Sequence, residues 1–131
     1  MDQRKMVLLA DASEEFRTLL REEIEKTGEF SVEVAQDGNE VLKKTEERDP
    51  DLLVMDAMLA GMDGLSVLRQ LQKREDMPMT ILTSGFVSDR MLMEASELGA
   101  AYFLPKPFET DVPFSPAIAS LASPELEVAV K

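Results

Sequence analysis

Apolar and polar residues alternate in blocks along most of the chain. Five short apolar runs are separated by longer segments in which apolar residues recur at helical spacing. The runs are typical of buried parallel strands, and the segments between them are typical of amphipathic helices. The predicted strands cover residues 6–10, 31–35, 52–55, 79–83 and 101–104. The predicted helices cover residues 13–28, 38–48, 64–73 and 88–98.

The first predicted helix has clear end signals and a clear apolar stripe. Ser13 is placed to cap its start, and Gly28 is placed to end it. The stripe consists of Phe16, Leu19, Leu20 and Ile24. Tyr102, in the last strand, is expected to be exposed or to cap the sheet.

Strand and helix signals follow each other regularly up to about residue 110. This alternation predicts an α/β fold of the doubly wound kind, with a five-stranded parallel sheet and helices on both faces. Residues 1–110 are expected to form one domain. In residues 111–131, Pro113, Pro116 and Pro124 interrupt the helical pattern. That segment is therefore predicted to be a broken or short fifth helix followed by a tail.

The composition removes several classes of function. The chain has 14 basic and 26 acidic residues, a net charge of −12, so we expect no binding to nucleic acid. It contains no cysteine and no histidine, which excludes disulfides, thiolate metal sites and imidazole acid–base chemistry. No apolar run approaches the length of a signal peptide or a membrane span. We therefore expect a cytoplasmic protein that does not bind membranes.

Polar residues follow four of the predicted strands. In a doubly wound sheet, the carboxyl ends of the strands form the ligand site. Two carboxylates there suit Mg²⁺, while a hydroxyl and an ammonium group can bind a phosphoryl group. One carboxylate could also act as the nucleophile and form an acyl phosphate. The residues are Asp11, Asp56, Thr83, Ser84 and Lys106.

At these residues the sequence resembles the receiver domains of two-component response regulators. The matching stretches are VLLAD at 7–11, DLLVMD at 51–56, MDG at 62–64, TSG at 83–85, LGA at 98–100 and KPF at 106–108. Within that family it is most similar to the receiver of the sporulation master regulator of spore-forming Firmicutes. That narrower resemblance depends on residues 63–68 and 97–108. The family implies a flavodoxin-like strand order of 2-1-3-4-5.

The resemblance also implies a role for each site residue. Asp56 would accept phosphate from a histidine kinase or a phosphotransfer protein. Asp11, Asp56 and the backbone carbonyl of Met58 would hold Mg²⁺. Thr83, Ser84 and Lys106 would bind the phosphoryl group and take part in switching. Phe103 would be the aromatic switch residue, and the Lys106–Pro107 peptide bond is expected to be cis.

One departure from the family concerns the metal. Receivers normally carry an acidic pair after the first strand, and Ala12 replaces its second member here. Losing a carboxylate should weaken Mg²⁺ binding. Glu14 or Glu15 could compensate, but both also suit the first turn of a helix. A degenerate receiver, acting as an interaction module without phosphorylation, is therefore the alternative to a phosphorylated switch.

Enzyme functions and self-association are two further points that the sequence addresses. We expect that the protein is not an enzyme. A flavin-binding protein would need a Ser/Thr/Gly-rich phosphate loop after the first strand, a phosphatase would need an Asp-x-Asp motif, and the sequence has neither. A shortened fifth helix would leave apolar surface exposed around Met91, Ala95 and Phe103, which favours either self-association, for example as a homodimer, or a rearranged tail. The sporulation regulator has a DNA-binding output domain after its receiver. Since residues 111–131 cannot hold one, we expect either an excised domain or a stand-alone receiver.

Overall fold

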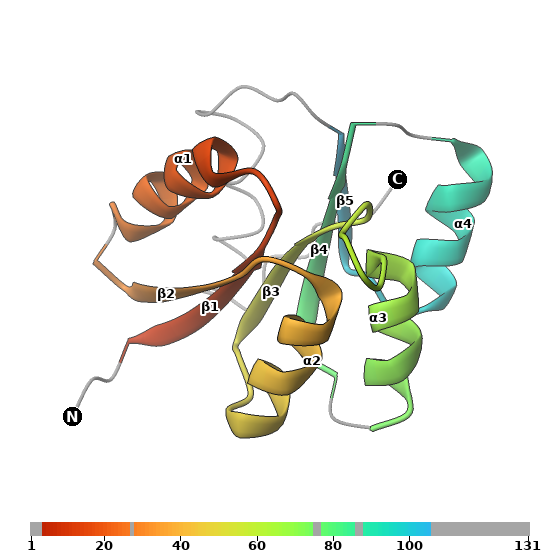
Figure 1. The fold of residues 1–131 in the computed structure, drawn as a ribbon, viewed down its shortest axis with the longest axis horizontal. Helices are drawn as coiled ribbons and strands as arrows, with labels where there is room; N and C mark the ends of the chain where they lie inside the picture. Colours follow the sequence, from red (N-terminus) through yellow and green to blue (C-terminus); the bar gives the residue numbers. More distant parts are fainter. Residues whose placement is uncertain (1–3, 27, 75–76, 86–87, 106–131) are drawn as a thin grey trace.

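Strands and helices alternate along the chain in the order that the sequence predicts (Figure 1). A computed structural model describes residues 4–26, 28–74, 77–85 and 88–105. The strands are β1 (Lys5–Ala10), β2 (Phe30–Ala35), β3 (Leu52–Asp56), β4 (Met79–Ser84) and β5 (Tyr102–Pro105). The helices in the described ranges are α1 (Glu14–Glu25), α2 (Gly38–Glu47), α3 (Gly64–Gln72) and α4 (Asp89–Glu97). None of these helices is long and apolar enough to cross a membrane.

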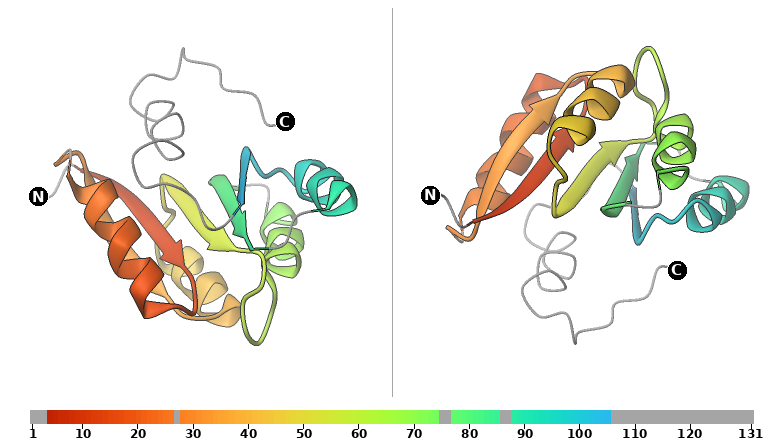
Figure 2. Two further views of the ribbon diagram at one scale, coloured as in Figure 1. Left: turned by 90° about the horizontal axis from the view of Figure 1, so that it is seen from above. Right: turned by 90° about the horizontal axis from the view of Figure 1, so that it is seen from below.

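The five strands form one parallel sheet in the order β2-β1-β3-β4-β5, which confirms the predicted fold. Figure 2 shows α1 on one face of the sheet and α2 and α3 on the other. The chain therefore changes direction across the sheet at β1, which lies between β2 and β3. Such a switch point leaves a crevice at the carboxyl ends of the strands, where ligands bind in folds of this kind.

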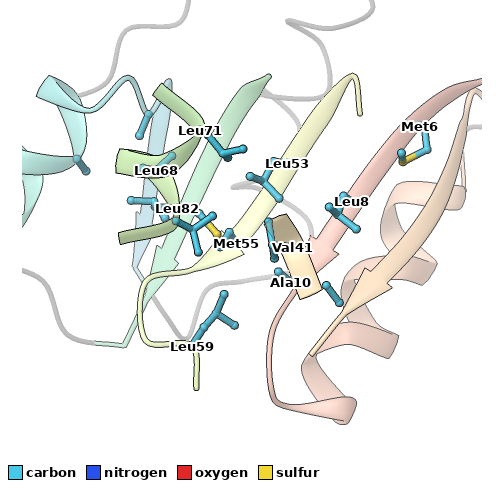
Figure 3. Packing of buried hydrophobic residues seen from close by; sticks show 14 residues of the cluster. Met6, Leu8, Ala10, Val41, Leu53, Met55, Leu59, Leu68, Leu71 and Leu82 are labelled. Atoms are coloured by element: carbon cyan, nitrogen blue, oxygen red, sulfur yellow. The ribbon is translucent and has the colours of Figure 1, made fainter. Parts of the chain in front are cut away.

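Two apolar clusters fill the space between the sheet and its helices. One cluster lies on the side of α2, α3 and α4 and includes Leu8, Leu53 and Leu68 (Figure 3). The other lies on the side of α1 and includes Leu9, Leu20 and Ile24. Because adjacent residues of β1 go to opposite clusters, both faces of that strand are buried. This explains why the strand reads as a continuous apolar run rather than as an alternating one.

Short polar side chains fix the start of each helix. Ser13, Asp37, Asp63 and Ser88 each accept a hydrogen bond from the backbone N–H three residues ahead. At the other end, the helix α1 stops at Glu25. Beyond it, Gly28 takes a positive φ of 77° and donates its N–H to the Glu25 carbonyl. The predicted cap at Ser13 is thereby confirmed, and the helix ends at Glu25 with Lys26 as its C-cap, shortly before the predicted stop at Gly28.

Two side chains differ from what the pattern of their element suggests. Leu19 is 42% exposed, so the buried part of the α1 stripe is narrower than its four apolar residues. Tyr102 is only 8% exposed and belongs to the cluster beneath α1. Tyr102 of the edge strand β5 is paired with Ile81 of β4, which belongs to the same cluster, so the expectation of an exposed tyrosine is wrong.

Candidate functional site

The strand register places three of the predicted site residues together. Ala10 of β1 is opposite Met55 of β3, so Asp11 and Asp56 both emerge at the carboxyl end of this pair. On the other side of β3, Asp56 is paired with Thr83 of β4. The site therefore lies at the switch point. Asp56 has β1, which leads to the Asp11 carboxylate, on one side and β4, which carries the Thr83 hydroxyl, on the other.

Asp11 is buried and held by its surroundings. It is 2% exposed, and its Oδ1 accepts a hydrogen bond from the Ser13 N–H at 2.8 Å. Its backbone N–H donates to the Ala35 carbonyl at 3.2 Å, and its carbonyl accepts from the Arg17 guanidinium at 2.5 Å. These contacts give the carboxylate a fixed position at the start of the β1–α1 connection.

Asp56 is half-buried, so its carboxylate can be reached from solvent. Its Oδ1 accepts a hydrogen bond from the Met58 N–H at 2.8 Å, which turns the chain sharply after β3. Ala57 donates its N–H to the Thr83 carbonyl at 2.8 Å, linking this turn to β4. The Met58 side chain is 66% exposed.

Two glycines allow the loop that follows Asp56 to pack closely against the helices. The sequence analysis did not predict this role. A Cβ at Gly64 would lie 2.7 Å from the Asp56 carbonyl oxygen. A Cβ at Gly38, on α2, would lie 2.0 Å from the Met62 carbonyl oxygen. Both positions need glycine because backbone approaches backbone there. The glycines lie in helix-start signals of the sequence, but nothing local indicates what they contact.

The two hydroxyl residues at the end of β4 are fully buried. Thr83 is 1% exposed, and its Oγ1 has no hydrogen-bond partner within the described part of the chain. Ser84 is 0% exposed. A buried hydroxyl without a partner is unfavourable, so Thr83 is a group for which an incoming acceptor would supply the missing bond.

The surface predicted to act in switching and dimer formation, around Met91, Ala95 and Phe103, is only partly exposed. Phe103 is half-buried and packs against the cluster on the side of α2, α3 and α4. Met91 is also half-buried, but Ala95 is 2% exposed and packs in the core. The expectation that Ala95 lies on an exposed apolar surface is therefore wrong, because α4 points this residue towards the sheet.

The acidic residues suit a magnesium ion with few protein ligands. Within residues 4–26, 28–74, 77–85 and 88–105, no cluster of three or more acidic side chains could hold a metal. Asp11 and Asp56 remain, and Mg²⁺ in phosphoryl-transfer sites often has only one or two carboxylate ligands plus water and phosphate. The residues present therefore fit the ion with a reduced donor set.

Some of the predicted features fall outside the described residues. These are Lys106, the Lys106–Pro107 peptide bond and the segment 111–131. Their roles therefore stay predictions.

This chain is similar in sequence to two named proteins. It is 41% identical over 106 residues to the alkaline phosphatase synthesis transcriptional regulatory protein PhoP of Bacillus subtilis, covering 79% of this chain. It is 39% identical over 104 residues to the response regulator MprA of Mycolicibacterium vanbaalenii, covering 78% of this chain. The matches cover 43% and 44% of these two relatives, so the chain spans less than half of their length. Neither is named as a sporulation regulator, and that narrower resemblance stays a prediction.

Solved structures and a family comparison agree with the relatives. The receiver domain of the Francisella response regulator 1452 superposes with a TM-score of 0.79 at 28% identity, covering 91% of this chain and 94% of that one. The response regulator domain of Thermotoga maritima CheB gives 0.74 at 26% identity, covering 92% of each chain. Residues 7–113 match the family described as the response regulator receiver domain. The chain therefore belongs to the response regulator receiver domain family.

Proposed function

We propose that this receiver accepts a phosphoryl group on Asp56 from a histidine kinase or a phosphotransfer protein. The observation that carries the proposal is the position of Asp56. It is half-buried at the switch point, paired with Thr83 and next to the strand that ends at Asp11. Receiver domains interact with histidine kinases and are generally not enzymes, which agrees with a switch.

The transfer requires no acid or base from this chain. A carboxylate oxygen of Asp56 attacks the phosphorus atom, and the bond from phosphorus to the donor's imidazole nitrogen breaks with its electron pair on that nitrogen. The product is an acyl phosphate. The Thr83 hydroxyl would then donate a hydrogen bond to a phosphoryl oxygen, and the Lys106 ammonium would pair with the phosphoryl charge.

The magnesium ligands would be Asp11, Asp56 and the backbone carbonyl of Met58. The ion supplies charge neutralisation at the transferred phosphoryl group. Since Ala12 provides no carboxylate, we expect weak binding of Mg²⁺ by this site. The chain's own contribution is to fix Asp11 through Ser13 and to turn Met58 towards Asp56.

Phosphorylation would change the surface on one side of the domain. It adds about −1.5 to −2 charges at Asp56. Thr83 moves towards the new acceptor, and the segment that follows β4 moves with it. The surface of α4 and β5, with Phe103, then changes its affinity for a partner.

Acetyl phosphate provides a test that needs no kinase. Intact mass after incubation with acetyl phosphate and Mg²⁺ is expected to show one added phosphoryl group, absent in Asp56→Asn. Persistence of the added mass in Asp56→Asn would refute the assignment.

A degenerate receiver is the second candidate, because Ala12 removes a ligand and no cluster of three acids is present in the described ranges. A Mg²⁺ titration of the phosphorylation rate separates the two. A rate that rises with Mg²⁺ supports the switch. Absence of phosphorylation at any Mg²⁺ concentration supports the interaction module.

A further inference from the structure

Helix α4 is weakly attached to the sheet. Ala95 is its only fully buried residue, whereas α3 buries Gly64, Val67, Leu68 and Leu71. Its N-cap Ser88 is only four residues after Ser84, the last residue of β4. Because α4 buries so little surface, a small change in free energy is enough to shift its position.

Polar contacts across the gap between α3 and α4 hold this helix in place. The Arg69 guanidinium forms an ion pair with the Glu94 carboxylate. One turn further on, the Gln72 side-chain amide donates to the Glu97 carbonyl at 3.2 Å. Both contacts join α3, which packs firmly on the sheet, to α4, which does not.

A pocket lined in part by Arg69 lies between α4 and the loop that follows Asp56. It has a volume of about 250 Å³, and its lining includes Ala57, Met58, Leu65, Arg69 and Met91. The loop after Asp56 therefore forms one wall and α4 forms another. Because side chains do not fill this space, it leaves room for Met91 of α4 to shift towards the loop.

We propose that the Arg69–Glu94 ion pair is a latch that holds α4 in its unphosphorylated position and thereby slows phosphorylation of Asp56. The inference rests on the proposed function, in which Thr83 must move towards the phosphoryl group. That movement displaces the end of β4 and the start of α4, which separates Glu94 from Arg69. A contact made in only one of two states stabilises that state, so its loss shifts the population to the other.

The size of the effect follows from the exposure of the pair. The side chains of Arg69 and Glu94 are 48% and 38% exposed, so the pair has the strength of a surface ion pair. Breaking it should raise the rate of phosphorylation about two- to fivefold. Arg21–Glu25 within α1 is a matched pair, with side chains 48% and 40% exposed, and it touches neither α3 nor α4.

The test compares Glu94→Gln, Arg69→Gln, the control Glu25→Gln and the charge swap of Arg69→Glu with Glu94→Arg. The rate of phosphorylation by acetyl phosphate is measured by intact mass with Mg²⁺ present. Hydrogen exchange of the α4 amides is measured on the same unphosphorylated proteins. We expect faster phosphorylation and faster exchange in both latch variants, wild-type values in the control, and recovery in the charge swap.

Two results overturn the latch and are distinguishable from failure of the proposed function. If Asp56 is phosphorylated at equal rates in Glu94→Gln, Glu25→Gln and the wild type, the latch is wrong and the proposed function stands. If exchange of the α4 amides is unchanged in Glu94→Gln, the ion pair does not hold the helix. A chain that takes up no phosphoryl group in any variant overturns the proposed function and the latch together.

Discussion

Thr83 provides a quantitative prediction because its buried hydroxyl has no hydrogen-bond partner in the described part of the chain. Valine has nearly the same shape and lacks the hydroxyl. A buried polar group that makes no hydrogen bond costs about 1–3 kcal/mol. We therefore expect Thr83→Val to raise the free energy of unfolding of the unphosphorylated domain by about 1–2 kcal/mol.

Thr80 supplies the matched control in the same strand. It is 0% exposed like Thr83, but its Oγ1 donates a hydrogen bond to the Pro78 carbonyl at 3.0 Å. Thr80→Val removes that bond and leaves the carbonyl without its donor. We expect it to lower the free energy of unfolding by about 1 kcal/mol.

Urea denaturation followed by circular dichroism measures both variants against the wild type. The two substitutions should change stability in opposite directions with similar m values, since the surface exposed on unfolding is the same. Thr83→Val should also weaken the response to phosphorylation, because it removes the hydroxyl that would donate a hydrogen bond to the phosphoryl group. If Thr83→Val destabilises the domain as much as Thr80→Val does, the Thr83 hydroxyl has a partner in the resting state and the reasoning is refuted.

Three further predictions concern the loop, the metal and the tail. Gly38→Ala should destabilise the domain by about 1–3 kcal/mol in urea denaturation, because the new Cβ meets the Met62 carbonyl, whereas a Cβ at Gly85 meets no atom of the described residues within 4 Å and Gly85→Ala should change little. Ala12→Asp should tighten Mg²⁺ binding by calorimetry, and equal affinities would contradict the reduced ligand set. Sedimentation should show self-association of the full chain that differs from that of residues 1–111; two identical monomers would contradict this.

The fold could be predicted from the sequence because its determinants are local. The run VLLA at 7–10 is apolar throughout since both faces of β1 are buried, and this is visible without any structure. Ser13 and Asp63 cap helices through contacts only three residues away. The site residues Asp11, Asp56 and Thr83 could be predicted for a related reason, because parallel strands bring their carboxyl ends to one edge.

What the sequence could not predict depends on contacts between distant segments. Arg69 and Glu94 are 25 residues apart, and nothing in either helix indicates that they meet. The missing partner of the Thr83 hydroxyl is a property of its whole surroundings. Leu19 fits the helical spacing of its neighbours, yet tertiary packing leaves it partly exposed. Such features follow from how the elements pack and not from the pattern of any one element.

Locating the phosphoryl group on the chain tests the central claim most directly. Borohydride reduces an aspartyl phosphate to homoserine, so peptide mass mapping after treatment with acetyl phosphate and borohydride identifies the modified residue. The account predicts homoserine at position 56 alone, in the peptide that contains the end of β3. Homoserine at another aspartate, or an added phosphoryl mass with no homoserine at position 56, would contradict it.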